Sequence, residues 1–277
     1  MKEYNKYAFM EDHMNIRNIF DLEGKTIVIT GGAGHLGKAM SEALAAFGAD
    51  LFILGHDAAK NLRQAQILEK KYHLRLCQGV PFDMDDEKVI QTSIHKIFEA
   101  TGKIDVLINN AAYSSARAFH EFTNEEWQKG IEGTINGVFR VTKHVLPYMM
   151  EQKRGNIINI ASMYGMVAPN MEIYGDSGQN NPANYGAGKA AVIQLTKYVA
   201  CVYAKDGIRA NAVSPGPFPN PTVQKNTDFI EALKEKNPMH RIGQPEDLQG
   251  IIIYLASDAS RYMTGQNIAV DGGWTAW

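Results

Sequence analysis

A tyrosine and a lysine four positions apart, Tyr185 and Lys189, are the residues of this sequence best suited to chemistry. Both fall near the start of an expected helix, where residues four apart share one face. A free phenol has a pKa of about 10, but a neighbouring ammonium group favours the phenolate. The pair is therefore suited to exchanging a proton with a substrate oxygen near neutral pH. The spacing alone is common by chance, so the surrounding elements must decide whether it is used.

A glycine-rich turn, TGGAGHLG at 30–37, joins the first expected strand to a helix. Glycines let the backbone turn tightly and approach a pyrophosphate, and a helix N-terminus presents unpaired N–H groups to an anion. Context confirms such a motif, and here the turn opens an alternating pattern of strands and helices. We therefore expect a dinucleotide cofactor, contacted by Gly31, Gly34, His35, Leu36 and Gly37.

The end of the second expected strand, LGHD at 54–57, bears on the choice of cofactor. An acidic residue at this strand tip holds the ribose 2′-hydroxyl of NAD and repels a 2′-phosphate. The tip falls at Gly55, which leaves room for a phosphate that His56 and Lys38 would face. The sequence thus slightly favours NADP over NAD. If the strand tip lies one or two residues later, Asp57 takes that position and NAD remains the alternative cofactor. His56 is alternatively an exposed loop histidine.

The wider pattern of the sequence predicts how these residues are positioned. From Lys25 onward, short apolar runs alternate with longer helical patterns, which predicts right-handed crossovers and a parallel sheet covered by helices. The expected fold class is α/β: a single Rossmann-type doubly wound parallel sheet of about seven strands, with helices on both faces. We expect strands at 26–30, 50–55, 74–80, 105–109, 156–161, 208–214 and 267–270, and helices at 36–47, 85–99, 125–150, 184–204 and 246–256, with another that ends at 71.

The chain is expected to form one domain with an extension. Residues 24–277 would be a single dinucleotide-binding catalytic domain, with a substrate lid around 216–240 whose helix covers 222–236. Residues 1–23 lie outside the pattern and would pack on the surface or on a neighbouring subunit, or fray.

Composition and charge exclude several classes of partner. The formal net charge is −2 and the 28 Lys and Arg residues are spread along the chain, so we expect no nucleic acid and no membrane as partner. The longest apolar run, 198–204, is far too short to cross a bilayer. Two cysteines outside any CxxC motif, and an N-terminus unlike a signal peptide, favour a cytoplasmic location. The histidines are widely spaced, so no metal site is expected.

Over residues 22–274 the sequence resembles the single-domain branch of the short-chain dehydrogenase/reductase family. Several motifs occur in the expected order, and jointly they are highly specific. They are the glycine-rich turn at 30–37, PFDM with Asp83 and Met84, NNAA with Asn110, Ala111 and Ala112, Asn136 in INGVF, Ser162 after NIINIA, Tyr185 with Lys189, SPG at 214–216, RIGQPED at 241–247, and TG with DGG between 264 and 273.

The resemblance implies a role for each of these residues. Tyr185 would donate or accept the proton, Lys189 would lower its pKa and bind the nicotinamide ribose, and Ser162 would hydrogen-bond the reacting oxygen. Asn136 would hold a water that links Lys189 to solvent. Further cofactor contacts are implied at Asp83, Met84, Asn110, Ala111, Ala112, Pro215, Gly216 and Phe218.

Purely structural roles stay open for three of these residues. Ser162 would then satisfy backbone groups at a strand end, Asn136 would bond a helix carbonyl, and Asn110 would tie two strands together.

The sequence also departs from the family pattern in three ways. His35 replaces the middle glycine of the turn, Ala112 replaces the last glycine of NNAG, and the interval from Ser162 to Tyr185 is longer than usual.

The long interval forms a polar loop, 163–184, that must lie near the mouth of the site. It contains Asn170, Glu172, Tyr174, Asp176, Gln179, Asn180 and Asn181. Such a density of polar groups suits a ligand with many hydroxyls, and the loop resembles those of family members acting on sugars and sugar acids, including the gluconate 5-dehydrogenase-like group. The alternative is an insertion that packs on a neighbouring subunit.

The sequence therefore predicts a reversible NAD(P)-dependent oxidoreductase for a secondary alcohol or ketone, of a sugar, sugar acid or polyol. Alternatives are an acyl-carrier 3-ketoacyl reductase, for which no basic docking face is evident, and a non-catalytic NAD(P)-sensing module. A sugar epimerase of the extended branch is disfavoured, because the chain is too short and its glycine spacing differs. The family implies a homo-oligomer, a tetramer or dimer, and the apolar stretch 198–204 would suit a dimer face or packing on the sheet.

Overall fold

The computed structural model describes residue 16, residues 18–175, residue 177 and residues 180–277. Most of the expected N-terminal extension thus lies outside the described residues, as do Asp176 and Gln179 of the polar loop.

Seven parallel strands form one sheet in the order β3-β2-β1-β4-β5-β6-β7. The chain builds outward from β1 to β3, then returns to the other side of β1 and continues to β7, which confirms the expected doubly wound sheet. Sheets of this kind bind ligands beyond the carboxyl ends of the strands, where the order reverses. The strands are β1 (Thr26–Thr30), β2 (Asp50–Gly55), β3 (Cys77–Pro81), β4 (Val106–Asn109), β5 (Gly155–Ile160), β6 (Ile208–Pro215) and β7 (Asn267–Val270).

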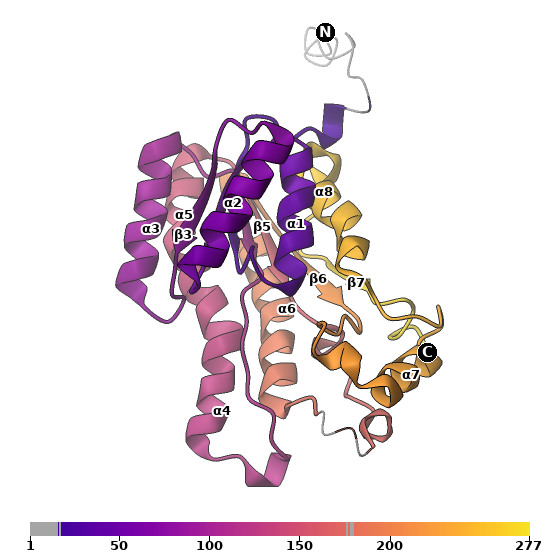
Figure 1. Cartoon of the computed structure of the whole chain (residues 1–277). Helices are drawn as coiled ribbons and strands as arrows, with labels where there is room; N and C mark the ends of the chain where they lie inside the picture. Colours follow the sequence, from indigo (N-terminus) through magenta and orange to yellow (C-terminus); the bar gives the residue numbers. More distant parts are fainter. Residues whose placement is uncertain (1–15, 17, 176, 178–179) are drawn as a thin grey trace, which may run out of the picture.

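Helices cover both faces of the sheet (Figure 1). One face carries α1 (His35–Ala46), α2 (Ala58–Tyr72) and α8 (Gln249–Ala256), and the other carries α3 (Glu87–Thr101), α5 (Gly137–Gln152) and α6 (Ala183–Tyr203). Two further helices, α4 (Asn124–Ile131) and α7 (Thr227–Lys236), lie below the carboxyl edge of the sheet in Figure 1.

Alternation along β1 explains why the strands read as continuous apolar runs. Ile27 and Ile29 pack in the core under α1, α2 and α8, whereas Val28 packs in the core under α3, α5 and α6. All three side chains are fully buried. Successive side chains of a strand point to opposite faces, so a strand covered on both sides needs an apolar residue at every position.

The expected helix at 125–150 is interrupted in the structure. It consists of α4, a π-helical turn at Glu132–Asn136, and α5. Inside this turn the Thr134 hydroxyl donates to the Gly130 carbonyl at 2.7 Å. A π turn adds one residue to the helix and shifts the spacing of its apolar residues only slightly, so the sequence pattern did not indicate it. Such turns are frequent at functional sites.

Two other boundaries differ from the expected ones. Strand β3 begins at Cys77 rather than 74, because α2 runs on to Tyr72 and ends in a left-handed His73, so the intervening residues form the connection. The lid helix α7 begins at Thr227 rather than 222, because the Asn226 side chain caps it by accepting from the Phe229 N–H at 3.2 Å.

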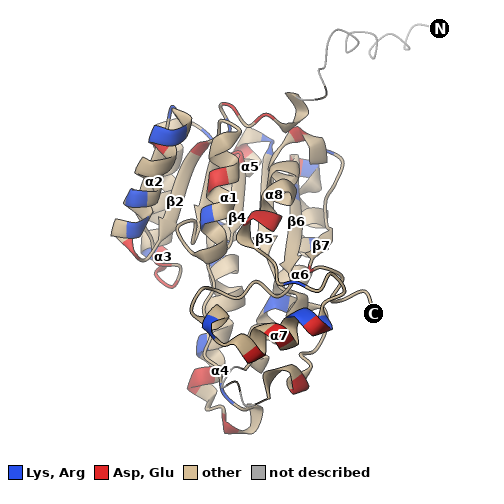
Figure 2. Ribbon diagram, turned by 45° about the vertical axis from the view of Figure 1, so that its right-hand side comes forward, with Lys and Arg blue, Asp and Glu red and all other residues tan. Residues whose placement is uncertain are grey.

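Acidic and basic residues are interspersed along the described ribbon (Figure 2), in line with the small net charge. Among the residues that the structure describes, none of the helices combines the length and the apolar character needed to span a membrane.

Candidate active site

A cleft of about 410 Å³ lies beyond the carboxyl ends of the central strands. It brings together most of the residues that the sequence singled out, from segments far apart in the chain. Its lining includes Gly31, Gly34, His35, Leu36, His56, Asn110, Ala111, Ala112, Ser162, Tyr185, Lys189, Pro215, Gly216 and Phe218. Four predicted site residues are not part of the lining: Gly37, Asp83, Met84 and Asn136.

Tyr185 and Lys189 lie on the first turns of α6, which begins after Pro182. The Lys189 ammonium donates to the Ile160 carbonyl at 2.7 Å and lies 5.6 Å from the centre of the Tyr185 ring. Lys189 is only 3% exposed. The helix therefore presents both residues on one face, as their spacing predicted, and the end of β5 holds the lysine in place.

Burial decides the pKa of both groups. Burial lowers the pKa of Lys189 to about 8, because the charged form loses its hydration. Burial also raises the pKa of Tyr185, and a hydrogen bond with Ser162 opposes that rise. Burial thus outweighs this hydrogen bond in the protein chain by itself, and the expected depression of the Tyr185 pKa stays a prediction for the complex with an oxidised nicotinamide.

Ser162 serves both the backbone and the site. It follows β5 and is nearly buried, and its hydroxyl accepts from the Tyr164 N–H at 3.2 Å. The same side chain hydrogen-bonds the Tyr185 phenol. The structural role and the predicted catalytic position of Ser162 thus coexist, and the hydroxyl and the phenol point to one place in the cleft.

The glycine-rich turn fits a dinucleotide. A Cβ at Gly37 would overlap the Gly31 carbonyl oxygen, so Gly37 acts by close packing under the turn rather than by lining the cleft. Asn110 donates its side-chain amide to the Thr30 and Gly31 carbonyls at 3.1 and 3.0 Å, which ties β4 to β1 at the cleft. Helix α1 starts directly after the turn, so its first N–H groups face the cleft for an anion.

A buried polar atom of His35 is a further indication that this turn binds a ligand. Its Nε2 atom is buried and has no hydrogen-bond partner among the described residues. Buried polar atoms are rarely left unpaired. Because His35 also lines the cleft, its ring is placed to bond a ligand oxygen, which fits the bound phosphates that the sequence predicted.

The tip of β2 has the register expected from the sequence. Gly55 is the last residue of the strand, and Gly55 and His56 both line the cleft. Asp57 instead caps α2, because its carboxylate accepts from the Lys60 N–H at 2.9 Å. That hydrogen bond turns Asp57 away from the role of a ribose-binding carboxylate. The His56 ring lies 3.6 Å from Asp83, which places Asp83 at the rim of the cleft.

Comparison with known proteins agrees with this geometry. Residues 31–275 match the family model described as Enoyl-(Acyl carrier protein) reductase. The 3-oxoacyl-acyl-carrier-protein reductase of Thermotoga maritima is 36% identical over 91% of this chain and 98% of its own length. The 2-dehydro-3-deoxy-D-gluconate 5-dehydrogenase of Bacillus subtilis is 32% identical over 94% of this chain and 98% of its own length.

The chain belongs to the short-chain dehydrogenase/reductase family. A solved structure of a gluconate 5-dehydrogenase from Burkholderia cenocepacia, in complex with NADP and tartrate, is similar to it with a TM-score of 0.85 and 29% identity, covering 94% of this chain and 98% of that one. The predicted family and oxidoreductase class are thus confirmed. The NADP of that complex agrees with the predicted choice of NADP or NAD.

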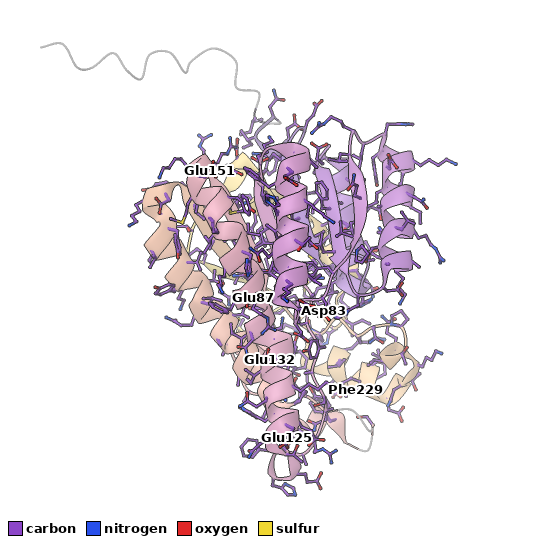
Figure 3. The ribbon with its side chains drawn as sticks, turned by 90° about the vertical axis from the view of Figure 1, so that its left-hand side faces the viewer. Asp83, Glu87, Glu125, Glu132, Glu151 and Phe229 are labelled. Atoms are coloured by element: carbon purple, nitrogen blue, oxygen red, sulfur yellow. The ribbon has the colours of Figure 1, made fainter. Side chains whose placement is uncertain are left out.

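Asn136, the expected counterpart of the family's helix asparagine, bonds to Glu132 and does not line the cleft, so its role in holding a water stays a prediction. The Asn136 amide donates to the Glu132 carboxylate at 2.6 Å, and Arg140 donates to the same carboxylate at 2.8 Å. Glu132 is labelled in Figure 3. The residue that faces α6 is Thr134: a Cβ at Gly188, between Tyr185 and Lys189, would overlap the Thr134 hydroxyl. The π turn separates these two faces, and no sequence pattern signalled it.

Met84 and Asp83 lie beside the cleft rather than in its lining. Met84 is buried against Gly137 of α5, and its carbonyl accepts from Arg140 at 2.9 Å. The Asp83 carboxylate accepts from the Asp85 N–H at 2.9 Å, which shapes the turn after β3. The described contacts of both residues are structural, and their cofactor contacts stay a prediction.

The polar loop differs from its expected form. Asn170 caps a short 3-10 turn at Met171–Tyr174, Glu172 is exposed, and Asn180 donates to the Arg117 carbonyl at 3.0 Å. None of the described loop side chains lines the cleft. Instead Tyr174 stacks on Phe229 of α7, with ring centres 5.3 Å apart. Phe229 is labelled in Figure 3. The loop therefore joins the lid through a small apolar core, which its polar composition concealed.

Proposed function

We propose that this protein transfers a hydride reversibly between NADP or NAD and a secondary alcohol or ketone. The observation that carries the proposal is the meeting of Ser162, Tyr185 and Lys189 with the glycine-rich turn in one cleft. A bound nicotinamide supplies the hydride donor or acceptor. Tyr185 exchanges the proton with the reacting oxygen, and Ser162 hydrogen-bonds that oxygen and orients it.

The cofactor residues follow from the lining of the cleft. The turn at 31–36 and the N-terminus of α1 bind the phosphates, and Pro215, Gly216 and Phe218 flank the nicotinamide. Lys189 binds the nicotinamide ribose. Its charge, together with that of an oxidised nicotinamide, offsets the burial that raises the pKa of Tyr185. Gly55 and His56 at the tip of β2 favour NADP.

The substrate that we propose is a sugar, a sugar acid or a polyol. The Bacillus subtilis relative is named for a sugar acid, and the Burkholderia cenocepacia complex holds tartrate, a hydroxylated acid. The loop at 163–184, which is rich in hydroxyl and amide groups, joins Ser162 to the helix that carries Tyr185.

A second candidate is the reduction of 3-oxoacyl thioesters, which the Thermotoga maritima relative favours through its 36% identity. A panel of aldonates, polyols and sugars, and of 3-oxoacyl thioesters, tested with NAD and NADP separately, distinguishes the two. Turnover of hydroxylated acids or polyols at a kcat/KM far above that of acyl thioesters supports the proposal. Turnover confined to thioesters or apolar ketones overturns the substrate class and leaves the reaction type intact.

We also propose that the protein forms a homo-oligomer through the outer faces of α5 and α6. Phe139 on α5 and Tyr198 on α6 are 51% and 60% exposed, and an apolar groove between the helices lies between them. Within the stretch 198–204, Val199 and Ala200 are buried in the core while Tyr198 and Val202 point outward. The stretch therefore packs on the sheet and also offers an apolar face.

A further inference from the structure

Three tyrosines converge beside the candidate active site. Tyr164 follows Ser162 by two residues in a short 3-10 turn, Met163–Gly165, and its hydroxyl lies 3.0 Å from that of Tyr174. Tyr164 is also next to the catalytic helix, because its carbonyl oxygen lies against Gly186, the residue after Tyr185. The two additional phenols thus connect the segment of Ser162 to the lid, because Tyr174 stacks on Phe229 of α7.

Close packing fixes the position of Tyr164 relative to Tyr185. A Cβ at Gly165 would lie 2.7 Å from the Lys189 carbonyl carbon, and one at Gly186 would lie 3.1 Å from the Tyr164 carbonyl oxygen. The Tyr164 N–H donates to the Ser162 hydroxyl at 3.2 Å. The two glycines let the turn lie directly on the first turns of α6, so the position of Tyr164 relative to the catalytic residues is fixed.

Tyr174 reaches the same place from the long loop. It is 7% exposed, because its ring stacks on Phe229 of α7 and packs with Ile173 and Leu233. The Asn226 amide donates to the Ser177 carbonyl at 3.0 Å and fastens the loop to the start of α7. The loop and the lid together therefore hold a second phenol against the first.

We propose that the hydroxyl pair of Tyr164 and Tyr174 binds a substrate hydroxyl next to the reacting carbon and so selects polyhydroxylated substrates. The inference rests on the proposed function, whose substrate class it deepens. One phenol donates to the other, so the pair keeps one O–H donor and free lone pairs. An alcohol both donates and accepts and satisfies both groups. A methylene at that position leaves buried polar groups unpaired, which is the basis of strong rejection of analogues that lack a hydroxyl.

The pair is suited to binding rather than to proton transfer. Burial and the neighbouring phenol raise the pKa of Tyr164, and burial raises the pKa of Tyr174. Both groups therefore stay protonated at neutral pH and act as neutral hydrogen-bonding groups. Tyr185 keeps the proton-transfer role because it alone of the three lies beside Lys189 in the cleft.

The test uses two ketones that differ in one hydroxyl, 1-hydroxybutan-2-one and butan-2-one. Their kcat/KM ratio is measured in the wild type and in Tyr164→Phe and Tyr174→Phe, with Kd from ligand-observed NMR where turnover is too slow to detect. We expect the wild type to prefer the hydroxyketone and each variant to lower the ratio about tenfold or more. Tyr148→Phe is the matched control, because Tyr148 of α5 bonds His95 of α3 through its hydroxyl and does not line the cleft.

The outcomes separate this inference from the proposed function. A wild type with no preference, or variants that slow both ketones equally, overturns the hydroxyl-binding role, and an equal loss indicates a structural role for the pair. If sugars and sugar acids are not substrates but the hydroxyketone preference exists and falls in the variants, the inference stands and the proposed substrate class fails. Phenylalanine keeps the ring stack, and if Tyr164→Phe does not fold, Tyr174→Phe carries the test.

Discussion

At the scale of single residues, burial is the property that turns ordinary side chains into a site. Lys189 and Tyr185 are recognised by their spacing, yet their chemistry depends on how deeply they are buried at the end of β5. The sequence predicted the residues and their shared face correctly. Periodicity shows which side of a helix a residue takes but not the desolvation there, so the sequence did not indicate that burial raises the pKa of Tyr185 in the protein by itself.

Tyr185→Phe removes the proton donor without removing the ring. We expect kcat to fall about 10²–10⁴-fold, since that is the usual contribution of a positioned acid or base. Cofactor affinity, measured by nucleotide fluorescence, should change little. Tyr203→Phe, at the far end of α6, is the control. A variant that keeps wild-type turnover would mean that Tyr185 is not the proton carrier, and a wild type without turnover on any substrate would favour a non-catalytic sensing module.

Lys189→Met tests the cost of burying an ammonium group. The folded-state pKa of about 8 lies below the ordinary 10.5, so the cost is fully present below pH 8. Between these values the unfolded chain binds more protons than the folded one, so stability of the wild type rises with pH. Relative to Lys189→Met, the free energy of unfolding of the wild type should rise by up to about 3 kcal/mol between pH 8 and pH 10.5. Urea unfolding at several pH values measures the gain, and parallel curves would contradict it.

At the scale of elements, a buried polar network holds the catalytic helix on the sheet. Asn159 of β5 donates to the Thr196 hydroxyl of α6 at 2.9 Å and accepts from Asn109 of β4 at 2.8 Å. Asn109 also donates to Thr142 of α5 at 3.1 Å. The sequence predicted the strands and helices that carry these residues, because a buried strand needs apolar residues throughout. It did not indicate the network, which joins four segments that meet only in the folded protein.

Asn159→Ala should lower the free energy of unfolding by about 2–4 kcal/mol. The substitution leaves the Asn109 amide short of a partner in the core and creates a small cavity. Chemical denaturation measures the loss, and the exposed Asn124→Ala should change stability by less than about 0.5 kcal/mol. Similar small losses in both variants would show that the network adds little to the packing of α6.

At the scale of the whole molecule, exposed apolar residues gather where α5 and α6 lie side by side. Their outer faces carry Phe139, Met150 and Tyr198, each more than a third exposed. Contiguous apolar surface of this kind marks an interaction site more often than scattered residues do. An oligomer that is paired through this face would leave the clefts at the carboxyl edge of each sheet accessible.

Tyr198→Glu should therefore reduce the molecular mass seen by sedimentation, because a carboxylate in an apolar interface has no partner. Phe119→Glu is the matched control, since Phe119 is 75% exposed, lies in the connection before α4 and does not line the groove between α5 and α6. An unchanged sedimentation coefficient in Tyr198→Glu, or a monomeric wild type, would contradict the proposed interface.

The sequence by itself determined the doubly wound sheet, the glycine-rich turn after β1 and the Tyr185–Lys189 pair, because periodicity, glycine spacing and helical spacing are local properties of the chain. Tertiary structure alone decided that the π turn directs Thr134 toward α6 and Asn136 toward Glu132. It also decided that Tyr174 of the long loop meets Tyr164 beside the catalytic residues. These outcomes depend on burial and on contacts between distant segments, which only the packed molecule creates.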